Sequence, residues 1–260
     1  MAVYRMAAAL CSTNQSHGRI GQTRYDGAAT EKRMRGKVAG RGNAAGLDAP
    51  FAALLVLCVA AAWALWVSPL LVPFRLFVTL IHEFGHALAA VLTGGHVLGI
   101  MVRLDGSGLT LVEGGNLFIT ASAGYLGSSL FGAGLLLAAR AREYRRLLLR
   151  ALTVGLVAAT VFFVRNPTGI GGAALLAVAF WLVAARGPDW LVSLLVCWLA
   201  VLNGLYAVND LVVLLELSGP AASASDAATL QRATGVPALV WAVGWTVLAI
   251  AAQYWALRRA

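Results

Sequence analysis

The chain has 260 residues, of which 60% are hydrophobic and only 12% are charged, and its mean hydropathy is +0.79. Soluble globular domains carry about 25% charged residues, so this composition excludes that class and indicates an integral membrane protein. The formal net charge is +9. Much of the positive charge is concentrated before residue 50, at Arg5, Arg19, Arg24, Lys32, Arg33, Arg35, Lys37 and Arg41.

Residues 1–49 are rich in glycine, alanine and charge and have no hydrophobic period, which predicts a disordered basic tail. The tail has no interleaved aromatic residues and no signature of a nucleic-acid-binding fold, so we expect no nucleic-acid partner. A basic tail of this kind suits the anionic, cytoplasmic face of a lipid bilayer. We therefore divide the chain into this tail and a transmembrane domain formed by residues 50–260.

Long apolar segments follow Pro50, and a helix needs about 20 such residues to cross a bilayer. These segments predict an all-α polytopic membrane protein, a bundle of six to seven transmembrane helices. The predicted helices span 51–72, 74–93, 116–139, 147–164, 170–186, 190–217 and 237–257.

The stretch between the second and third segments, GGHVLGIMVRLDGSGLTLVEGGN, breaks the helical pattern with glycines. Apolar and polar residues alternate on both sides of Asp105-Gly106, and an Asp-Gly pair between such runs is a strong hairpin signal. We expect a small β-hairpin beside the membrane helices.

Basic residues in short loops predict the orientation, because cytoplasmic loops carry an excess of Lys and Arg. The N-terminal tail, the basic cluster at 140–150 and the terminal Arg258-Arg259 should then share the cytoplasmic side. This requires an even number of crossings before Arg140, whereas the predicted segments give three. Either one early segment does not span, or the region 94–116 re-enters the membrane, where irregular backbone needs surrounding protein or a watery cavity.

The second segment contains TLIHEFGHALAAVLTGG, residues 79–95, which places three ionisable groups in an apolar helix. His82 and His86 are four residues apart and project from one helical face, so both imidazoles can bind one metal ion. Glu83 is rotated by about 100° and can reach a water held by the metal without binding the metal itself. This is the H-E-x-x-H arrangement of zinc peptidases, and it predicts a Zn²⁺ site with Glu83 as the catalytic group.

A catalytic zinc usually has three protein ligands, so one more is needed. Asp210 is the best-placed carboxylate, because the stretch VLNGLYAVNDLVVLLEL sets it deep in an apolar helix with Asn203 about two turns earlier. We expect Asp210 to complete the metal site and Asn203 to bind substrate. Asp226 and Asp105 are the alternative ligands, although Asp226 also fits a solvated loop carboxylate and Asp105 a turn residue.

The segment HEFGHALAAVLTGG resembles the site-2 protease family of intramembrane zinc metallopeptidases. Three further stretches resemble a compact bacterial peptidase-like branch: DGSGLT at 105–110, SAGYLGSSLFGAGLL at 122–136 and SDAATLQRATGVPALVWAVGW at 225–245. The resemblance covers about residues 70–250. In the family the third metal ligand is an aspartate in a late transmembrane helix, and the comparable stretch here runs from Asn203 to Asp210.

The resemblance implies a zinc metalloendopeptidase of the bacterial cytoplasmic membrane that cuts membrane-embedded or membrane-adjacent segments of a membrane protein substrate. Two alternatives remain open. A non-catalytic relative would keep the zinc and serve as a membrane scaffold. A small ion transporter would use His82, His86 and Asp210 as an ion path, but the two halves of the sequence lack the inverted repeat of many transporters.

Overall fold

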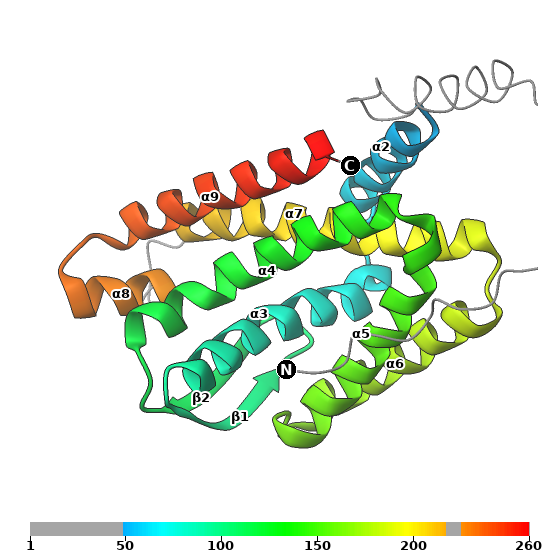
Figure 1. The fold of residues 1–260 in the computed structure, drawn as a ribbon. Helices are drawn as coiled ribbons and strands as arrows, with labels where there is room; N and C mark the ends of the chain where they lie inside the picture. The colour runs from blue at the N-terminus through cyan, green and yellow to red at the C-terminus, as the bar shows by residue number, and fades with distance from the viewer. Residues whose placement is uncertain (1–48, 217–224, 260) are drawn as a thin grey trace, which may run out of the picture. The chain divides into compact units, whose positions relative to one another are not determined.

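The computed structural model describes residues 49–216 and 225–259, with only the backbone described at residues 207 and 210–216. The predicted disordered tail, apart from Ala49, therefore lies outside the described residues. All described residues belong to one compact unit, which is mostly helical (Figure 1). Its elements are α2 Ala49–Ala64, η1 Pro69–Leu71, α3 Val72–Leu92, β1 His96–Val102, β2 Gly108–Glu113, α4 Leu117–Arg140, η2 Arg142–Tyr144, α5 Arg145–Phe162, α6 Pro167–Arg186, α7 Asp189–Glu216, α8 Asp226–Thr234 and α9 Ala238–Arg259.

Five of the described helical segments are long and apolar enough to cross a membrane, so the predicted count of six to seven is not confirmed. They are Pro69–Leu92, Leu117–Arg140, Pro167–Arg186, Asp189–Tyr206 and Ala238–Arg259. The predicted span 51–72 instead breaks at Ser68-Pro69, and α2 has 16 residues, about 24 Å, which is short of a bilayer core of about 30 Å. The segment predicted at 147–164 corresponds to α5, which has 18 residues and begins with Arg145 and Arg146.

α2 and α3 both pack against α7. The first turn of α2 and the first residue of α7, Asp189, line one cavity, and Trp66 beyond the end of α2 stacks on Tyr206 with ring centroids 5.0 Å apart. Near the start of α3, Phe74 contacts Trp198 edge to face at 5.8 Å. α4 then returns along α3, since Phe77 contacts Phe131 and Gly85 faces Ala123.

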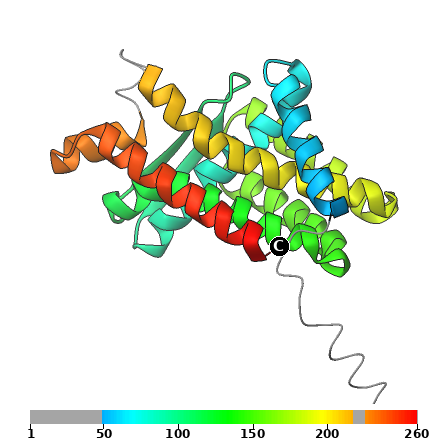
Figure 2. The same ribbon diagram turned by 90° about the horizontal axis from the view of Figure 1, so that it is seen from above.

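Only two of the candidate spans, Pro69–Leu92 and Leu117–Arg140, precede the basic cluster at 140–150, which is the even number that the predicted orientation requires. The basic ends of the helices then gather at one end of the bundle. Pro50, Arg140 and Arg146 line one cavity there, and α9 runs parallel to α4, so that Arg259 ends on the same side (Figures 1 and 2). Phe118 contacts Trp241 at 5.5 Å near the opposite end of that helix pair.

The predicted β-hairpin is confirmed, with β1 and β2 paired antiparallel. Its turn needs glycine at position 106, where φ is +90°, and the Asp105 carboxylate accepts hydrogen bonds from the Ser107 amide and hydroxyl. The hairpin folds back along α3, since the Thr79 hydroxyl donates to the Gly106 carbonyl at 2.9 Å. If α3 crosses the membrane, the hairpin tip lies at the same depth, as the re-entrant alternative requires.

The two strands differ in what covers their outer edges. β1 also bonds to the α5–α6 connection: the Ile100 amide donates to the Phe163 carbonyl at 2.7 Å, and the Asn166 side chain bonds both backbone groups of Val102. β2 pairs with β1 alone among the described residues. Its outer edge is therefore free of strand partners and runs beside the site described below.

α4 is the central helix of the bundle and packs against α3, α7 and α9 (Figure 1). Its approach to α3 is unusually close, because Gly85 on α3 faces the carbonyl of Ala123 on α4 with no room for a side chain between them. Phe77 and Phe131 continue this contact, and Phe77 also meets Phe180 of α6. The tight α3–α4 contact brings the backbone of α4 directly against the histidine-bearing face of α3.

Candidate metal centre

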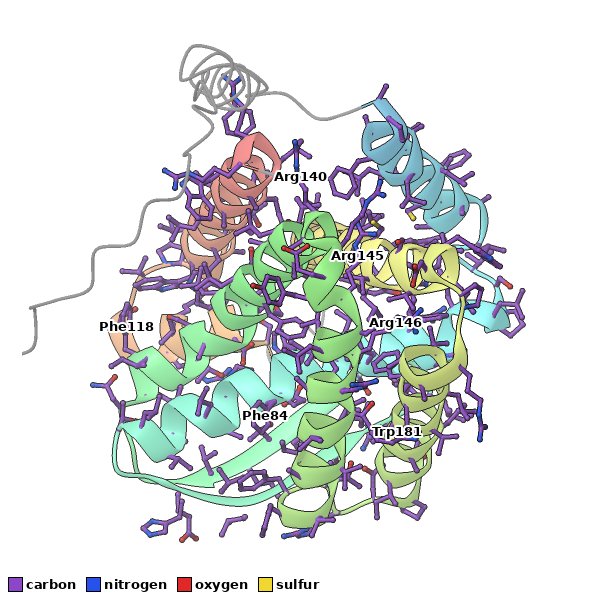
Figure 3. All side chains as sticks on the ribbon, turned by 45° about the vertical axis from the view of Figure 1, so that its right-hand side comes forward. Phe84, Phe118, Arg140, Arg145, Arg146 and Trp181 are labelled. Atoms are coloured by element: carbon purple, nitrogen blue, oxygen red, sulfur yellow. The ribbon has the colours of Figure 1, made fainter. Side chains whose placement is uncertain are left out.

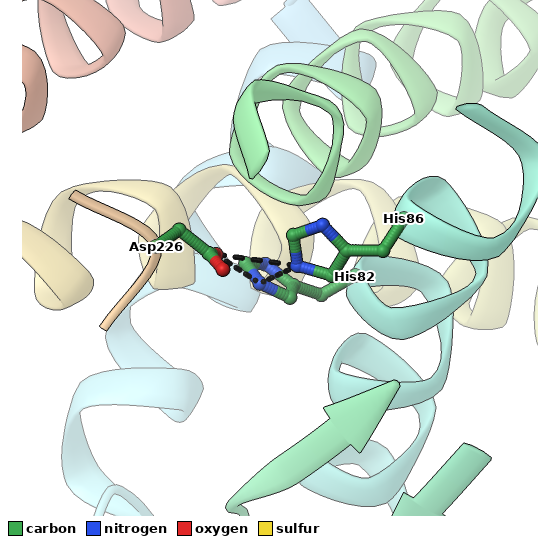
Figure 4. A group of neighbouring side chains, drawn as sticks. All are labelled: His82, His86 and Asp226. Atoms are coloured by element: carbon green, nitrogen blue, oxygen red, sulfur yellow. Dashed lines mark hydrogen bonds and ion pairs between the residues drawn. The ribbon is translucent and has the colours of Figure 1, made fainter. Parts of the chain in front are cut away.

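Three side chains from two distant parts of the chain converge on one point (Figure 4). His82 and His86 project from α3, and Asp226 projects from the first turn of α8. The His82 and His86 Nε2 atoms are 3.1 Å apart, and the Asp226 Oδ2 atom lies 3.1 Å from the first and 3.2 Å from the second. The three donor atoms therefore form a nearly equilateral triangle.

The backbone of α4 orients His86. The His86 Nδ1 atom lies 2.7 Å from the Thr120 carbonyl oxygen, which can only accept a hydrogen bond. Nδ1 therefore carries the hydrogen, and in the neutral ring the lone pair is on Nε2, which faces His82 and Asp226. A second hydrogen bond of this kind fixes the orientation of metal-binding histidines in many proteins.

The donor set fits a zinc ion. Zinc holds imidazole nitrogen and carboxylate oxygen at about 2.0 to 2.2 Å, and a tetrahedron of such bonds places its ligand atoms about 3.3 Å apart. The three observed separations are 3.1 to 3.2 Å, so the donors need to open only slightly. Gly124 leaves the required space, since a Cβ built there would lie 2.5 Å from His82 Nε2 and slightly closer to His86 Nε2.

The charge of Asp226 favours a cation at the same point. Burial raises the pKa of Asp226, but hydrogen bonds and charge interactions with His82 and His86 outweigh burial and hold this pKa below its usual range. The carboxylate also begins α8, where Ser225 caps the helix by accepting a hydrogen bond from the Ala228 amide at 3.2 Å. The positive end of a helix dipole stabilises a carboxylate in its first turn. Asp226 is thus an anion that faces two imidazole nitrogens.

Glu83 lies beside the donors and is held by the hairpin. Its side chain is 5% exposed, and its Oε2 accepts a hydrogen bond of 2.6 Å from the Thr110 hydroxyl on β2. The same hydroxyl also lies 3.1 Å from the backbone carbonyl of Glu83. Gly108 packs directly on the Glu83 carboxylate and leaves no room for a side chain of its own. β2 therefore sets the position of the carboxylate through Thr110 and Gly108.

All four ionisable groups line one cavity of about 850 Å³ between α3, α4, α7, α8 and β2. Asn203 of α7 lines the same cavity and is 1% exposed. Its amide nitrogen donates to the Leu199 carbonyl at 2.8 Å, whereas its Oδ1 has no hydrogen-bond partner among the described residues. A buried acceptor without a partner is costly, which marks this amide as a group available to a ligand.

The family model described as Peptidase M50B-like matches residues 55–256. The chain belongs to this site-2 protease family. No curated protein and no solved structure matches the chain. Membership of a membrane metallopeptidase family, together with the five apolar helices, makes the M50B-like chain an integral membrane protein.

The M50B-like chain places a different carboxylate beside the two histidines from the expected third ligand, Asp210: the carboxylate there is that of Asp226. The interpretation of Asp226 as a solvated loop residue is wrong, because its carboxylate contacts both histidines. Asp105 lines the cavity, but its carboxylate is engaged by Ser107 in the hairpin turn. Asp210 belongs to α7, but its side chain lies outside the described residues, so its ligation stays a prediction.

Three residues of the centre were not singled out in the sequence: Thr110, Thr120 and Gly124. A weak signal existed for Gly124, which lies in the quoted stretch SAGYLGSSLFGAGLL, where small residues recur at helical spacing. Thr110 likewise ends the quoted stretch DGSGLT, whereas the carbonyl of Thr120 had no signal, and each acts through a contact with a residue at least 27 positions away.

Proposed function

We propose that the chain is a zinc metallopeptidase that hydrolyses peptide bonds in membrane-embedded or membrane-adjacent segments of other proteins. One observation carries the proposal: His82, His86 and Asp226 converge in a cavity that also contains the buried Glu83 carboxylate. Family membership supports the same chemistry.

In this proposal His82, His86 and Asp226 hold the zinc ion, and Asp226 takes the place that the sequence reasoning gave to Asp210. When bound, the zinc ion supplies Lewis acidity to a water molecule and to the scissile carbonyl. Glu83 accepts a proton from the attacking water and later donates it to the leaving amine. Thr110 holds the Glu83 carboxylate in position for both transfers through its 2.6 Å hydrogen bond.

Substrate would be held by two groups that line the cavity. The Asn203 amide bonds a peptide group of the substrate, which gives its buried Oδ1 a partner. The free edge of β2 pairs with an extended substrate segment, because an unpaired strand edge presents a row of backbone donors and acceptors. An unwound segment is also what a peptidase needs, since a helix keeps its peptide bonds hydrogen-bonded internally.

We base the proposed orientation of the chain in the membrane on the arrangement of its basic residues. We assign the end of the bundle that carries Arg140, Arg146 and Arg259 to the cytoplasmic face of a bacterial cytoplasmic membrane, in line with the excess of basic residues in cytoplasmic loops. The metal centre lies toward the other end of α4, near Thr120 and Gly124, and the hairpin folds back from the end of α3 along that helix. In this proposal the chain has two partners: a membrane protein, which is its substrate, and the lipid bilayer.

The experiment compares the wild-type chain with Glu83→Gln in liposomes that contain a library of tagged transmembrane peptides, with new termini mapped by mass spectrometry. The matched control is Glu143→Gln, which removes an exposed carboxylate in η2, outside the cavity and the hairpin. We expect cleavage by the wild type and the control, and a loss of at least about 100-fold in Glu83→Gln, since positioned acid–base groups contribute about 10² to 10⁴ in rate.

Equal cleavage by wild type and Glu83→Gln would refute the peptidase. Zinc bound at one ion per chain without any cleavage by the wild type would favour the non-catalytic scaffold instead. Zinc-dependent ion flux through the same liposomes would favour the transporter.

A further inference from the structure

A second cavity, of about 520 Å³, lies at the basic end of the bundle. It is enclosed by the first turn of α2, the turn between α4 and α5, and the first residues of α7. Four arginines line it: Arg140, Arg142, Arg145 and Arg146. Figure 3 shows three of them, Arg140, Arg145 and Arg146, where α4 passes into α5. The peptidase chemistry uses none of these residues.

Two of the arginines are occupied in holding the helices together. Arg146 pairs with Asp189 at 2.5 Å and donates to the carbonyls of Ala184, at 3.1 Å, and Gly187, at 2.9 Å. Arg145 is 8% exposed and donates to the Ala139 carbonyl at 2.6 Å and to the hydroxyl of Ser193. These contacts fix the walls of the cavity and keep it open between α4, α5 and α7.

The other two arginines are available to a ligand. The side chains of Arg140 and Arg142 make no hydrogen bond or ion pair with any residue in 49–216 or 225–259. The cavity also has two carboxylates in its lining, Glu143 and Asp189, so its six charged side chains sum to 4 − 2 = +2. Two unpaired guanidinium groups in a positive cavity favour an anion with several acceptor oxygens, for which phosphate is the best match.

Apart from Ser193, which bonds Arg145, the remaining lining residues are apolar, and this distinguishes the cavity from a site for a soluble anion. Phe51, Leu54 and Val192 line it, and the exposed Trp190 stands beside them. Three of the candidate membrane spans, Leu117–Arg140, Pro167–Arg186 and Asp189–Tyr206, begin or end at this level. Tryptophan and arginine gather at the depth of the lipid headgroups, where an apolar wall meets the first carbons of the acyl chains.

We propose that this cavity binds the phosphate group of an anionic phospholipid, with Arg140 and Arg142 as its charged donors and Phe51, Leu54 and Val192 against the glycerol and upper acyl carbons. Basic pockets between transmembrane helices bind anionic headgroups in this manner. The tail of this chain joins α2 beside the cavity, but it carries eight basic residues before residue 50 and only Asp26, Glu31 and Asp48 as acids. Its charge therefore makes it a poor occupant.

The test measures the affinity of the full chain, in a zwitterionic detergent, for fluorescent phosphatidylglycerol and for fluorescent phosphatidylcholine. The double variant R140Q/R142Q should lose about 30-fold in affinity for phosphatidylglycerol, because each basic residue near an anionic headgroup contributes about 1 kcal/mol and 1.4 kcal/mol is tenfold. Affinity for phosphatidylcholine should be unchanged. If the double variant fails to fold, Arg142→Gln alone, at an exposed position, should lose about fivefold.

The matched control is R258Q/R259Q, which removes the same charge at the same end of the bundle but outside the cavity. These two arginines lie over the rings of Tyr254 and Trp255 on their own helix. The control should bind phosphatidylglycerol as the wild type does. An equal loss of affinity for phosphatidylglycerol in both double variants would overturn the proposed site, because it would show that any positive charge at this end of the bundle attracts the lipid. Displacement of the lipid by inorganic phosphate at equal concentration would overturn a lipid as the occupant.

Discussion

Replacement of Gly124 by alanine should release the metal without unfolding the protein. A methyl group at this position would lie 2.5 Å from His82 Nε2 and slightly closer to His86 Nε2, whereas ordinary contacts of a Cβ atom begin at 3.4 Å. Relief requires the imidazole rings to rotate away by about 1 Å, which exceeds the tolerance of about 0.2 Å for metal–ligand distances. The rings are the mobile ends of their side chains, so the helices themselves keep their contact.

We expect Gly124→Ala to bind zinc at least about 100-fold more weakly, since loss of a single outer-shell partner already costs 10- to 100-fold. The matched control is Gly134→Ala on the same helix, where an added Cβ meets no atom within 4 Å. Both changes raise helix propensity by about 1 kcal/mol, so their difference isolates the contact with the histidines. The assay is competition with a fluorescent zinc chelator, with thermal unfolding followed in parallel. Zinc affinity in Gly124→Ala within threefold of the control would refute the reasoning.

Three further substitutions test the groups around the centre. Thr110→Val should lower kcat about 10- to 100-fold with zinc content unchanged, because it removes a hydrogen bond to the charged Glu83. The control Thr153→Val on α5 should leave both kcat and zinc content unchanged. Equal kcat in the two variants would contradict the role of Thr110. Asn203→Leu should lower kcat/KM about tenfold without lowering the melting temperature, because its buried Oδ1 has no described partner; a large loss of stability would instead mark a structural residue. Asn166→Ala should lower the free energy of unfolding by about 2 kcal/mol in denaturant titrations, because two bonds to Val102 anchor β1, and an unchanged value would contradict that anchoring.

Local signals predicted much of the fold. The Asp105-Gly106 pair between alternating runs located the hairpin, and Gly106 has the positive φ that such a turn needs. The helix predicted at 116–139 corresponds to α4, and the structure adds its cap, Asn116, whose side chain accepts a hydrogen bond from the Ile119 amide at 3.0 Å. The prediction of helix boundaries was less accurate where it rested on hydropathy alone. The apolar run at 51–72 conceals the break at Ser68-Pro69, because hydropathy does not register a single turn.

The candidate site was predictable only as far as it is local. His82, Glu83 and His86 share one helix, so the periodicity of that helix predicts their common location. The carboxylate of Asp226 lies 144 residues from His82 along the chain, and no sequence period connects the two. Its own helix is short and begins in a polar stretch, which favours a solvated interpretation until the bundle is folded. Packing of α8 against α4 and α9 brings Asp226 to the histidines, and that packing is a property of the whole chain.

The central claim is that His82, His86 and Asp226 hold one zinc ion beside Glu83. X-ray absorption at the zinc edge tests it most directly, on the purified wild type and on the paired variants Asp226→Asn and Asp210→Asn. We predict one zinc per chain with two imidazoles and a carboxylate oxygen at about 2.0 to 2.2 Å, unchanged in Asp210→Asn and lost or rearranged in Asp226→Asn. An unchanged zinc shell in Asp226→Asn together with its loss in Asp210→Asn would contradict the account.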